Sequence, residues 1–314
     1  MTEQKWKAVG GSKSSSIDNK TRKKVKAKSP KTENLIFIGS EEHYDSFWLK
    51  MMFISAAYAM TKKIRPAHKQ TIAYVDEGYT KLEKLTLDFL RDTQKFEILK
   101  ISSSADIATY LNRDRENYKL QDVAFFSHGV VGSIMMNYPS DGVDFDKDTL
   151  NSIKKDAFVT DGRLYSYACR TGVSVDSASF VNDAAAKPEQ SLAQKIADHF
   201  GIEVHAFLKR SYYGDVLRVK SQSKAIAETL SKARKDKDGE VIQIPPEHEA
   251  LPHPGLADSW NPWSGPKREG TNDFALWHKG GGLVLPIAAD TPAGLSADMR
   301  VFKKPQPKPA KSPK

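Results

Sequence analysis

Two residues that can do acid–base and nucleophilic chemistry each follow a short apolar run. His128 comes directly after Val123–Ser127 and is followed by Gly129, and Cys169 comes directly after Leu164–Ala168. Cys169 is also the only cysteine in the chain. A thiol attacks a carbonyl as the thiolate, and a nearby imidazole can take up its proton or stabilise the anion. The pair therefore predicts a cysteine hydrolase.

Such a reaction also needs fixed hydrogen-bond donors for the oxyanion that develops on the substrate carbonyl. Gly129 suits this task because a glycine lets a substrate carbonyl approach its backbone N–H closely. The N–H of Cys169 can supply the second donor, and Gly172 permits a sharp bend after the cysteine. We therefore expect an oxyanion hole formed by the amides of Gly129 and Cys169.

The elements that must position these residues alternate between short apolar runs and longer amphipathic ones. Strands are predicted at 35–38, 71–75, 96–101, 123–127, 164–167 and 202–207, and helices at 44–61, 80–91, 148–158, 189–200 and after a cap at Ser103 or Ser104. This alternation is typical of a mostly parallel six-stranded sheet flanked by helices. Reactive residues of such sheets gather beyond the carboxyl ends of the strands, where His128 and Cys169 both fall. Ends of neighbouring strands lie only about 5 Å apart, so the two side chains could meet.

The domain limits follow from composition. The pattern predicts a basic disordered tail over 1–33, the α/β domain over 34–215, a C-terminal extension packed on it over 216–302, and a disordered Lys/Pro-rich tail over 303–314. Within the extension, Phe274–Trp277 and Leu283–Ile287 flank the glycine run 280–282 and predict a β-hairpin.

Charge separates the tails from the body. The chain carries +9 overall, of which 1–33 contributes +7 and 303–314 contributes +5, so the body is mildly acidic at −3. Nucleic acid is therefore not the expected main partner, and any contact with it would be weak and through the tails. With one cysteine and no apolar stretch after the N-terminal charges, we expect no disulfide, no signal peptide, no membrane span and a soluble protein of the cytoplasm.

Beyond single residues, two motifs resemble the caspase-like (clan CD) cysteine peptidases. They are Phe125-Phe-Ser-His128-Gly129 and Ser166-Tyr-Ala-Cys169-Arg170-Thr-Gly172, in that order and 41 residues apart from histidine to cysteine. The resemblance covers roughly residues 34–215. It implies a caspase-like fold, with Cys169 as nucleophile and His128 as general acid/base, and a protein or peptide substrate cleaved through a thioester.

The resemblance also suggests which residues meet the substrate. Tyr167 stands where caspases carry Gln and metacaspases carry Asp, so a metacaspase-type preference is not predicted from this position. Arg170 follows the cysteine and could face an acidic group. The segment that corresponds to a pocket-shaping loop contains Arg210, Tyr212 and Tyr213, which become further candidates for peptide contact.

Other interpretations stay open. A caspase-like module that binds partners with vestigial dyad residues would leave the same motifs, and a nucleic-acid binder could act through its tails. The tails are also compatible with a bacterial effector or toxin exported without a cleavable signal, whose delivery or immunity partner the sequence does not identify. Self-cleavage between Arg170 and Glu189 is compatible with the polar loop there. No cofactor and no metal site is predicted.

Overall fold

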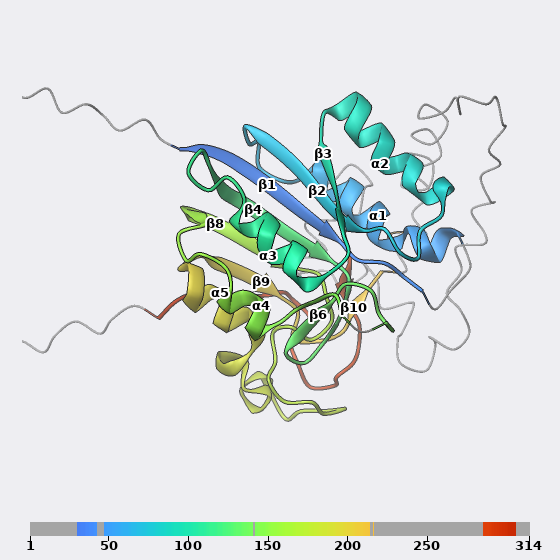
Figure 1. The fold of residues 1–314 in the computed structure, drawn as a ribbon. Helices are drawn as coiled ribbons and strands as arrows, with labels where there is room; N and C mark the ends of the chain where they lie inside the picture. The colour runs from blue at the N-terminus through green and yellow to red at the C-terminus, as the bar shows by residue number, and fades with distance from the viewer. Residues whose placement is uncertain (1–29, 43–46, 141, 214–215, 217–284, 306–314) are drawn as a thin grey trace, which may run out of the picture.

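The computed structural model describes residues 30–42, 47–140, 142–213, 216 and 285–305 (Figure 1). Its centre is a seven-stranded sheet in the order β12-β9-β8-β4-β1-β2-β3. These strands are β1 (Lys31–Ile38), β2 (Lys69–Val75), β3 (Glu97–Ile101), β4 (Tyr118–Phe126), β8 (Phe158–Ser166), β9 (Glu203–Ala206) and β12 (Arg300–Phe302). All neighbours pair in parallel except β12, which runs antiparallel to β9. The predicted mostly parallel α/β architecture is confirmed.

Helices cover both faces of this sheet. They are α1 (Phe47–Thr61), α2 (Lys81–Gln94), α3 (Ser104–Asn112), α4 (Lys147–Asn151) and α5 (Leu192–Phe200), with short 3-10 turns at Asp183–Ala186 and Pro188–Gln190. Figure 1 shows α3, α4 and α5 in front of the sheet. Because successive strand residues point to opposite faces, Ile36 and Ile38 pack with α1 and α2, whereas Leu35 and Phe37 pack with α3, α4 and α5. A strand buried on both faces must be apolar throughout, which explains the unbroken run at the end of β1.

Local sequence signals account for several helix ends. Ser103 caps α3 with its side chain and forms a capping box with Asp106, as expected for a serine before a helix. Gly201 ends α5 in the left-handed conformation, at a φ of 71°. The predicted helix over 148–158 is shorter in the structure, because α4 stops at Asn151 and Phe158 already begins β8.

Two expectations about the sheet and its limits need correction. The sheet has seven strands instead of six, because the three residues of β12 add an antiparallel edge. A three-residue segment with one buried side chain, Phe302, is too short to show a strand pattern. At the other end, β1 begins at Lys31, inside the segment predicted as a tail, and Glu33 is buried with Arg115 2.5 Å from its carboxylate.

The C-terminal segment pairs with distant parts of the chain. The short strand β11 (Ile287–Ala288) runs antiparallel to β10 (Ser211–Tyr212), and β12 joins the central sheet. The predicted hairpin arm 274–277 lies outside the described residues, as do 1–29 and 306–314. None of the described helices is both long enough and apolar enough to cross a lipid bilayer.

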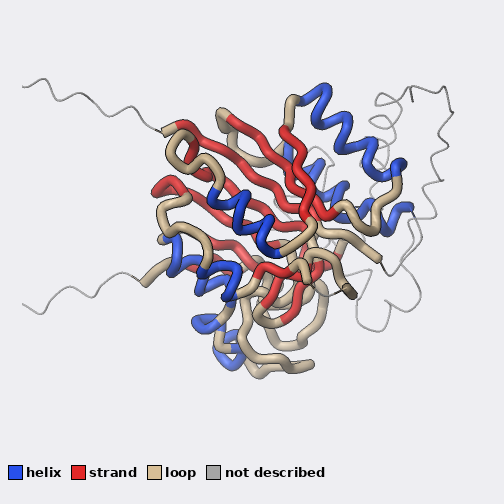
Figure 2. The backbone as a smooth tube through the Cα atoms, viewed as in Figure 1, coloured by secondary structure: helices blue, strands red, loops and turns tan. Residues whose placement is uncertain are grey.

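A small three-stranded sheet follows β4. It consists of β5 (His128–Val130), β6 (Ser133–Met135) and β7 (Asp144–Phe145), all antiparallel. Figure 2 shows loops, in tan, beyond the ends of the central strands. His128 therefore lies at the start of a hairpin that follows the carboxyl end of β4.

Candidate active site

The two strands that precede the predicted dyad are direct neighbours. β4 and β8 pair in parallel, with Phe125 opposite Ser166, so the segments that follow them leave the sheet at the same edge. The backbones of these segments touch: a Cβ added to Gly129 would lie 2.9 Å from the nitrogen and 2.7 Å from the oxygen of Cys169. A side chain of any size would separate them. The structure thus brings the predicted His-Gly and Cys segments together, and only glycine permits so close an approach.

His128 is held by a carboxylate that the sequence did not reveal as part of the site. Its Nε2 lies 2.7 Å from Oε2 of Glu41, which is fully buried just beyond the end of β1. The imidazole itself is about one-fifth exposed (21%), and its ring meets Phe53 edge-on and Tyr138 at centroid distances of 5.1 Å. A buried carboxylate on one ring nitrogen fixes the orientation of the imidazole.

The sulfur of Cys169 has a different partner. The Ser211 N–H donates to Sγ at 3.3 Å, and the Ser211 hydroxyl lies 3.2 Å from the same sulfur. Ser211 is buried in β10, whereas Cys169 is partly exposed and so reachable from solvent. The backbone and hydroxyl groups of Ser211 therefore hold the sulfur at this position.

The two residues of the predicted dyad are therefore held by separate hydrogen-bond partners. Within the described part of the chain, the hydrogen bonds of the sulfur go to Ser211 and the side-chain bond of His128 goes to Glu41. Catalytic hydrogen bonds are often absent or long in a free enzyme and tighten only when substrate is bound.

Three of the residues predicted to contact substrate are instead buried. Tyr167, Tyr212 and Tyr213 are at most 3% exposed, so their side chains do not face a peptide. Tyr213 donates its hydroxyl proton to the Tyr167 carbonyl at 3.0 Å, and its ring packs edge-on against Phe53. Burial raises the pKa of Tyr213 well above that of a free phenol. Tyr212 and Tyr213 were predicted to lie in a loop, but the pairing of β10 with β11 carries that segment into the core.

The two predicted arginines differ in their surroundings. Arg170 adopts a left-handed backbone with a φ of 56°, and its guanidinium, mostly buried, forms a 2.5 Å ion pair with Asp176. This pairing matches a structural salt bridge better than a free substrate contact. Arg210 is partly exposed, and its backbone is bonded to Thr291 and Ala289 of the C-terminal segment. Arg210 stays a candidate for peptide contact.

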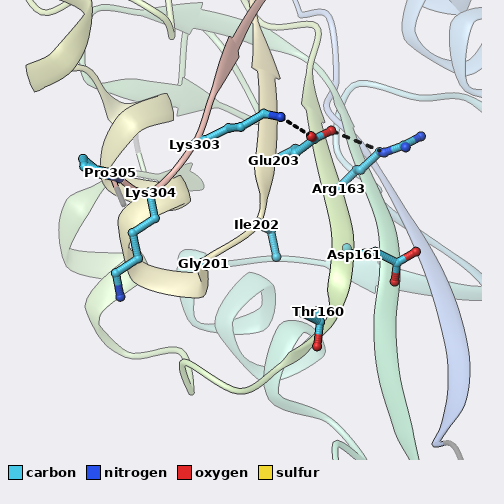
Figure 3. Close-up of a pocket in the computed structure, with 10 residues that line it drawn as sticks. Thr160, Asp161, Arg163, Gly201, Ile202, Glu203, Lys303, Lys304 and Pro305 are labelled. Atoms are coloured by element: carbon cyan, nitrogen blue, oxygen red, sulfur yellow. Dashed lines mark ion pairs between the residues drawn. The ribbon is translucent and has the colours of Figure 1, made fainter. Parts of the chain in front are cut away.

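A separate pocket lies at the opposite edge of the sheet (Figure 3). It has a volume of about 360 Å³ and is lined by residues 160–163, 201–203 and 303–305, near the beginnings of β8 and β9 and the end of β12. Its charges pair internally, since Glu203 lies 2.6 Å from Lys303 and 3.6 Å from Arg163. This pocket is remote from His128 and Cys169 and takes no part in their chemistry.

Among the residues that the structure describes, no three His, Cys, Asp or Glu side chains are grouped to hold a metal ion.

Comparison with known proteins adds no assignment to this geometry: no protein-family model matches the chain, and no curated protein matches it either.

Proposed function

We propose that this protein is a cysteine endopeptidase with a caspase-like α/β domain, in which Cys169 and His128 form the catalytic dyad. The observation that carries the proposal is the backbone contact between Gly129 and Cys169, at the shared carboxyl edge of two neighbouring parallel strands. Nucleophilic catalysis by cysteine uses a reachable sulfur and an oriented imidazole, and here the sulfur is partly exposed while the imidazole is held by a buried carboxylate.

The reaction would run in two halves. The Cys169 thiol gives its proton to His128 as its sulfur forms a bond to the substrate carbonyl carbon. As the carbon–nitrogen bond breaks, the imidazolium returns that proton to the leaving amine, which leaves a thioester. Water then attacks the thioester as His128 takes up one of the water protons. The carbon–sulfur bond breaks, the acid product leaves, and the imidazolium returns the proton to the sulfur.

The surrounding groups have distinct tasks in this scheme. Glu41 keeps the imidazole oriented and offsets its positive charge, while the Ser211 N–H stabilises the departing sulfur anion. The amides of Gly129 and Cys169 are the proposed donors to the oxyanion, and their close approach suits a shared target.

The proposal is tested by labelling with a peptidyl electrophile, followed by mass spectrometry of the labelled peptide. We expect an adduct on Cys169 that disappears in Cys169→Ala. His128→Ala should slow labelling by roughly 10²- to 10⁴-fold, the usual contribution of general acid–base catalysis. Alkylation of wild-type Cys169 no faster than that of a free thiol would contradict the assignment.

A binding module with a vestigial dyad is the second candidate, favoured by the engagement of the sulfur with Ser211 instead of His128. In that case the biological effect of the protein would survive Cys169→Ala, and no peptide in a library would be cut. Loss of both the effect and the cleavage in this variant would exclude the module.

A further inference from the structure

The carboxylate that holds His128 is carried by the short loop after β1. Glu41 is fully buried and follows the strand by way of Gly39 and Ser40, so its position depends on the backbone of these two residues. The Gly39 N–H donates to the Phe126 carbonyl at 2.8 Å. The loop therefore lies against the end of β4, the strand that leads to His128, and its backbone decides where the Glu41 carboxylate lies.

Gly39 is also in close contact with the residue that precedes His128. A Cβ added to Gly39 would lie 2.9 Å from both Cβ and Oγ of Ser127, and 2.6 Å from the Met136 carbonyl oxygen. The Ser127 hydroxyl donates to the His128 carbonyl at 3.0 Å. The loop that carries Glu41 and the segment that carries the imidazole are thus packed against each other at Gly39.

A tyrosine from the next loop holds the carbonyl group of Gly39. The Tyr79 hydroxyl donates to the Gly39 oxygen at 2.5 Å, at the short end of the range for hydrogen bonds between oxygen atoms. Tyr79 is only 6% exposed. Burial, together with the charges of Glu41 and Glu83, raises the pKa of Tyr79 well above that of a free phenol. The hydroxyl therefore keeps its proton and stays a donor.

The neighbours of Tyr79 in the chain fix its own position. The Thr80 N–H donates to Oε2 of Glu83 at 2.7 Å, and the Thr80 hydroxyl contacts the same oxygen, so the start of α2 is capped. On the other side, Gly78 turns the chain with a φ of 82°, and a Cβ there would lie 3.2 Å from Cβ of Ser40. The loop after β2 therefore packs directly on the loop after β1.

We infer that Tyr79 is a positioning residue of the candidate active site: its hydroxyl fixes the Gly39 carbonyl and thereby keeps the Glu41 carboxylate against the His128 imidazole. This inference rests on the proposed peptidase function. Because β2 is two strands away from β4 in the sheet, Tyr79 acts through the loop after β1 and not on the reacting atoms. The carboxylate in turn decides which ring nitrogen carries the proton, since Nε2 donates to Glu41 and leaves Nδ1 for proton transfer.

The experiment compares wild type with Tyr79→Phe, which removes the hydroxyl and keeps the buried ring. One readout is the rate at which a peptidyl electrophile labels Cys169, and the other is the nitrogen NMR spectrum of the His128 imidazole. Tyr79→Phe should slow labelling roughly two- to tenfold, the factor that corresponds to one net hydrogen bond. The neutral imidazole should carry its proton on Nε2 in wild type, and the share with the proton on Nδ1 should rise in the variant.

Tyr74→Phe is the matched control. Tyr74 is as deeply buried, at 5% exposure, but its hydroxyl bonds Asp76 at 2.9 Å instead of the loop after β1. This variant loses a comparable hydrogen bond, so its labelling rate should stay within about twofold of wild type. The imidazole spectrum should also be unchanged.

A double-mutant cycle with Glu41→Gln tests whether Tyr79 acts through the carboxylate. If it does, adding Tyr79→Phe to Glu41→Gln should slow labelling less than about twofold further, because the interaction that the hydroxyl supports is already lost. The same factor for Tyr79→Phe in both backgrounds would show that the two residues act independently and would overturn the inference.

The two readouts separate this inference from the proposed function. Failure of Cys169 to react faster than a free thiol would remove the peptidase function, while the imidazole spectrum would still decide whether Tyr79 positions Glu41. Wild-type labelling of Tyr79→Phe, an equal loss in Tyr74→Phe, or an imidazole spectrum that Tyr79→Phe leaves unchanged would overturn only the inference. A proton on Nδ1 in the neutral imidazole of wild type would overturn it as well.

Discussion

Replacing Gly129 by alanine tests the contact on which the proposed function depends. The new Cβ would meet the Cys169 oxygen at 2.7 Å, the Ala168 Cβ at 2.8 Å and the Cys169 nitrogen at 2.9 Å. Ordinary carbon contacts begin near 3.5 Å, so the two segments must separate by roughly 0.6–0.8 Å. None of the three atoms is the far end of a flexible side chain, so the displacement falls on the backbone that carries the sulfur.

Two quantities follow from this displacement. Overpacking of this kind costs about 1–3 kcal/mol of unfolding free energy. A shift approaching 1 Å in a reacting group can cost about 10²-fold in rate, so we expect labelling of Cys169 to slow by roughly ten- to hundredfold. Chemical denaturation measures the first quantity, and the rate of labelling by a peptidyl electrophile under native conditions measures the second.

Gly132→Ala is the matched control in the same hairpin. Its φ of 89° makes alanine strained there, but a Cβ at this position meets nothing within 4 Å. It should therefore cost about 1–3 kcal/mol of stability through backbone strain and leave the labelling rate within about twofold. If both variants lost the same factor in labelling rate, or if Gly129→Ala were labelled as fast as the wild type, the backbone contact of Gly129 with Cys169 would not be what positions the sulfur.

The other predictions concern groups around the site and the sheet. Glu41→Gln should lower kcat/KM about tenfold or more on every peptide, basic or neutral, because it leaves a neutral partner beside the catalytic imidazole; an effect confined to one substrate class would contradict that role. Ser211→Ala removes the hydroxyl but keeps the N–H donor to the sulfur, so labelling should change less than about tenfold, and a complete loss would show that the hydroxyl is essential. Burial opposes ionisation of Asp76, yet hydrogen bonds from two lysines and a tyrosine outweigh it and lower its pKa from 3.8 to about 2. Because the folded pKa lies below the unfolded one, Asp76 should contribute about 1 kcal/mol, after discount for exposure, above pH 4 and lose it as pH falls toward 2; denaturation of Asp76→Asn across that range checks this. Phe302→Ala should cost about 3–5 kcal/mol of unfolding free energy, against less than about 0.5 for the exposed Val301→Ala in the same strand, as measured by denaturation.

The parts of the fold and site that could be predicted from sequence are those with a local signal. Apolar runs bounded by helical patterns mark the parallel strands, and the position of a reactive residue after such a run places it at the carboxyl edge. This was sufficient to place His128 and Cys169 at one edge of the sheet. The sequence also contains a sign of the contact between their two segments, because Gly129 has no side chain and so allows the backbones to approach.

The parts that could not be predicted depend on contacts between residues far apart in the chain. Glu41 is one of several acidic residues after β1, and nothing local tells that it is fully buried against an imidazole 87 residues later. Tyr212 looks like an exposed loop residue until its strand pairs with Ile287. The seventh strand, β12, could not be predicted for the same reason, since only its pairing with β9 makes this three-residue segment a strand.

These distant contacts connect the described part of the C-terminal segment to the candidate site. The sulfur of Cys169 is supported by Ser211 in β10, and β10 is itself paired with β11 from that segment. Phe302 of β12 reaches the same region, because a Cβ on Gly172, three residues after the cysteine, would lie 3.1 Å from its ring. The described residues 285–302 therefore pair with β10 through β11 and with β9 through β12, next to the segment that carries Cys169. The entropy cost of closing a loop grows only slowly with its number of residues, so a change in the number of residues between β10 and β11 should be tolerated. Loss of either strand would instead remove a support of the sulfur.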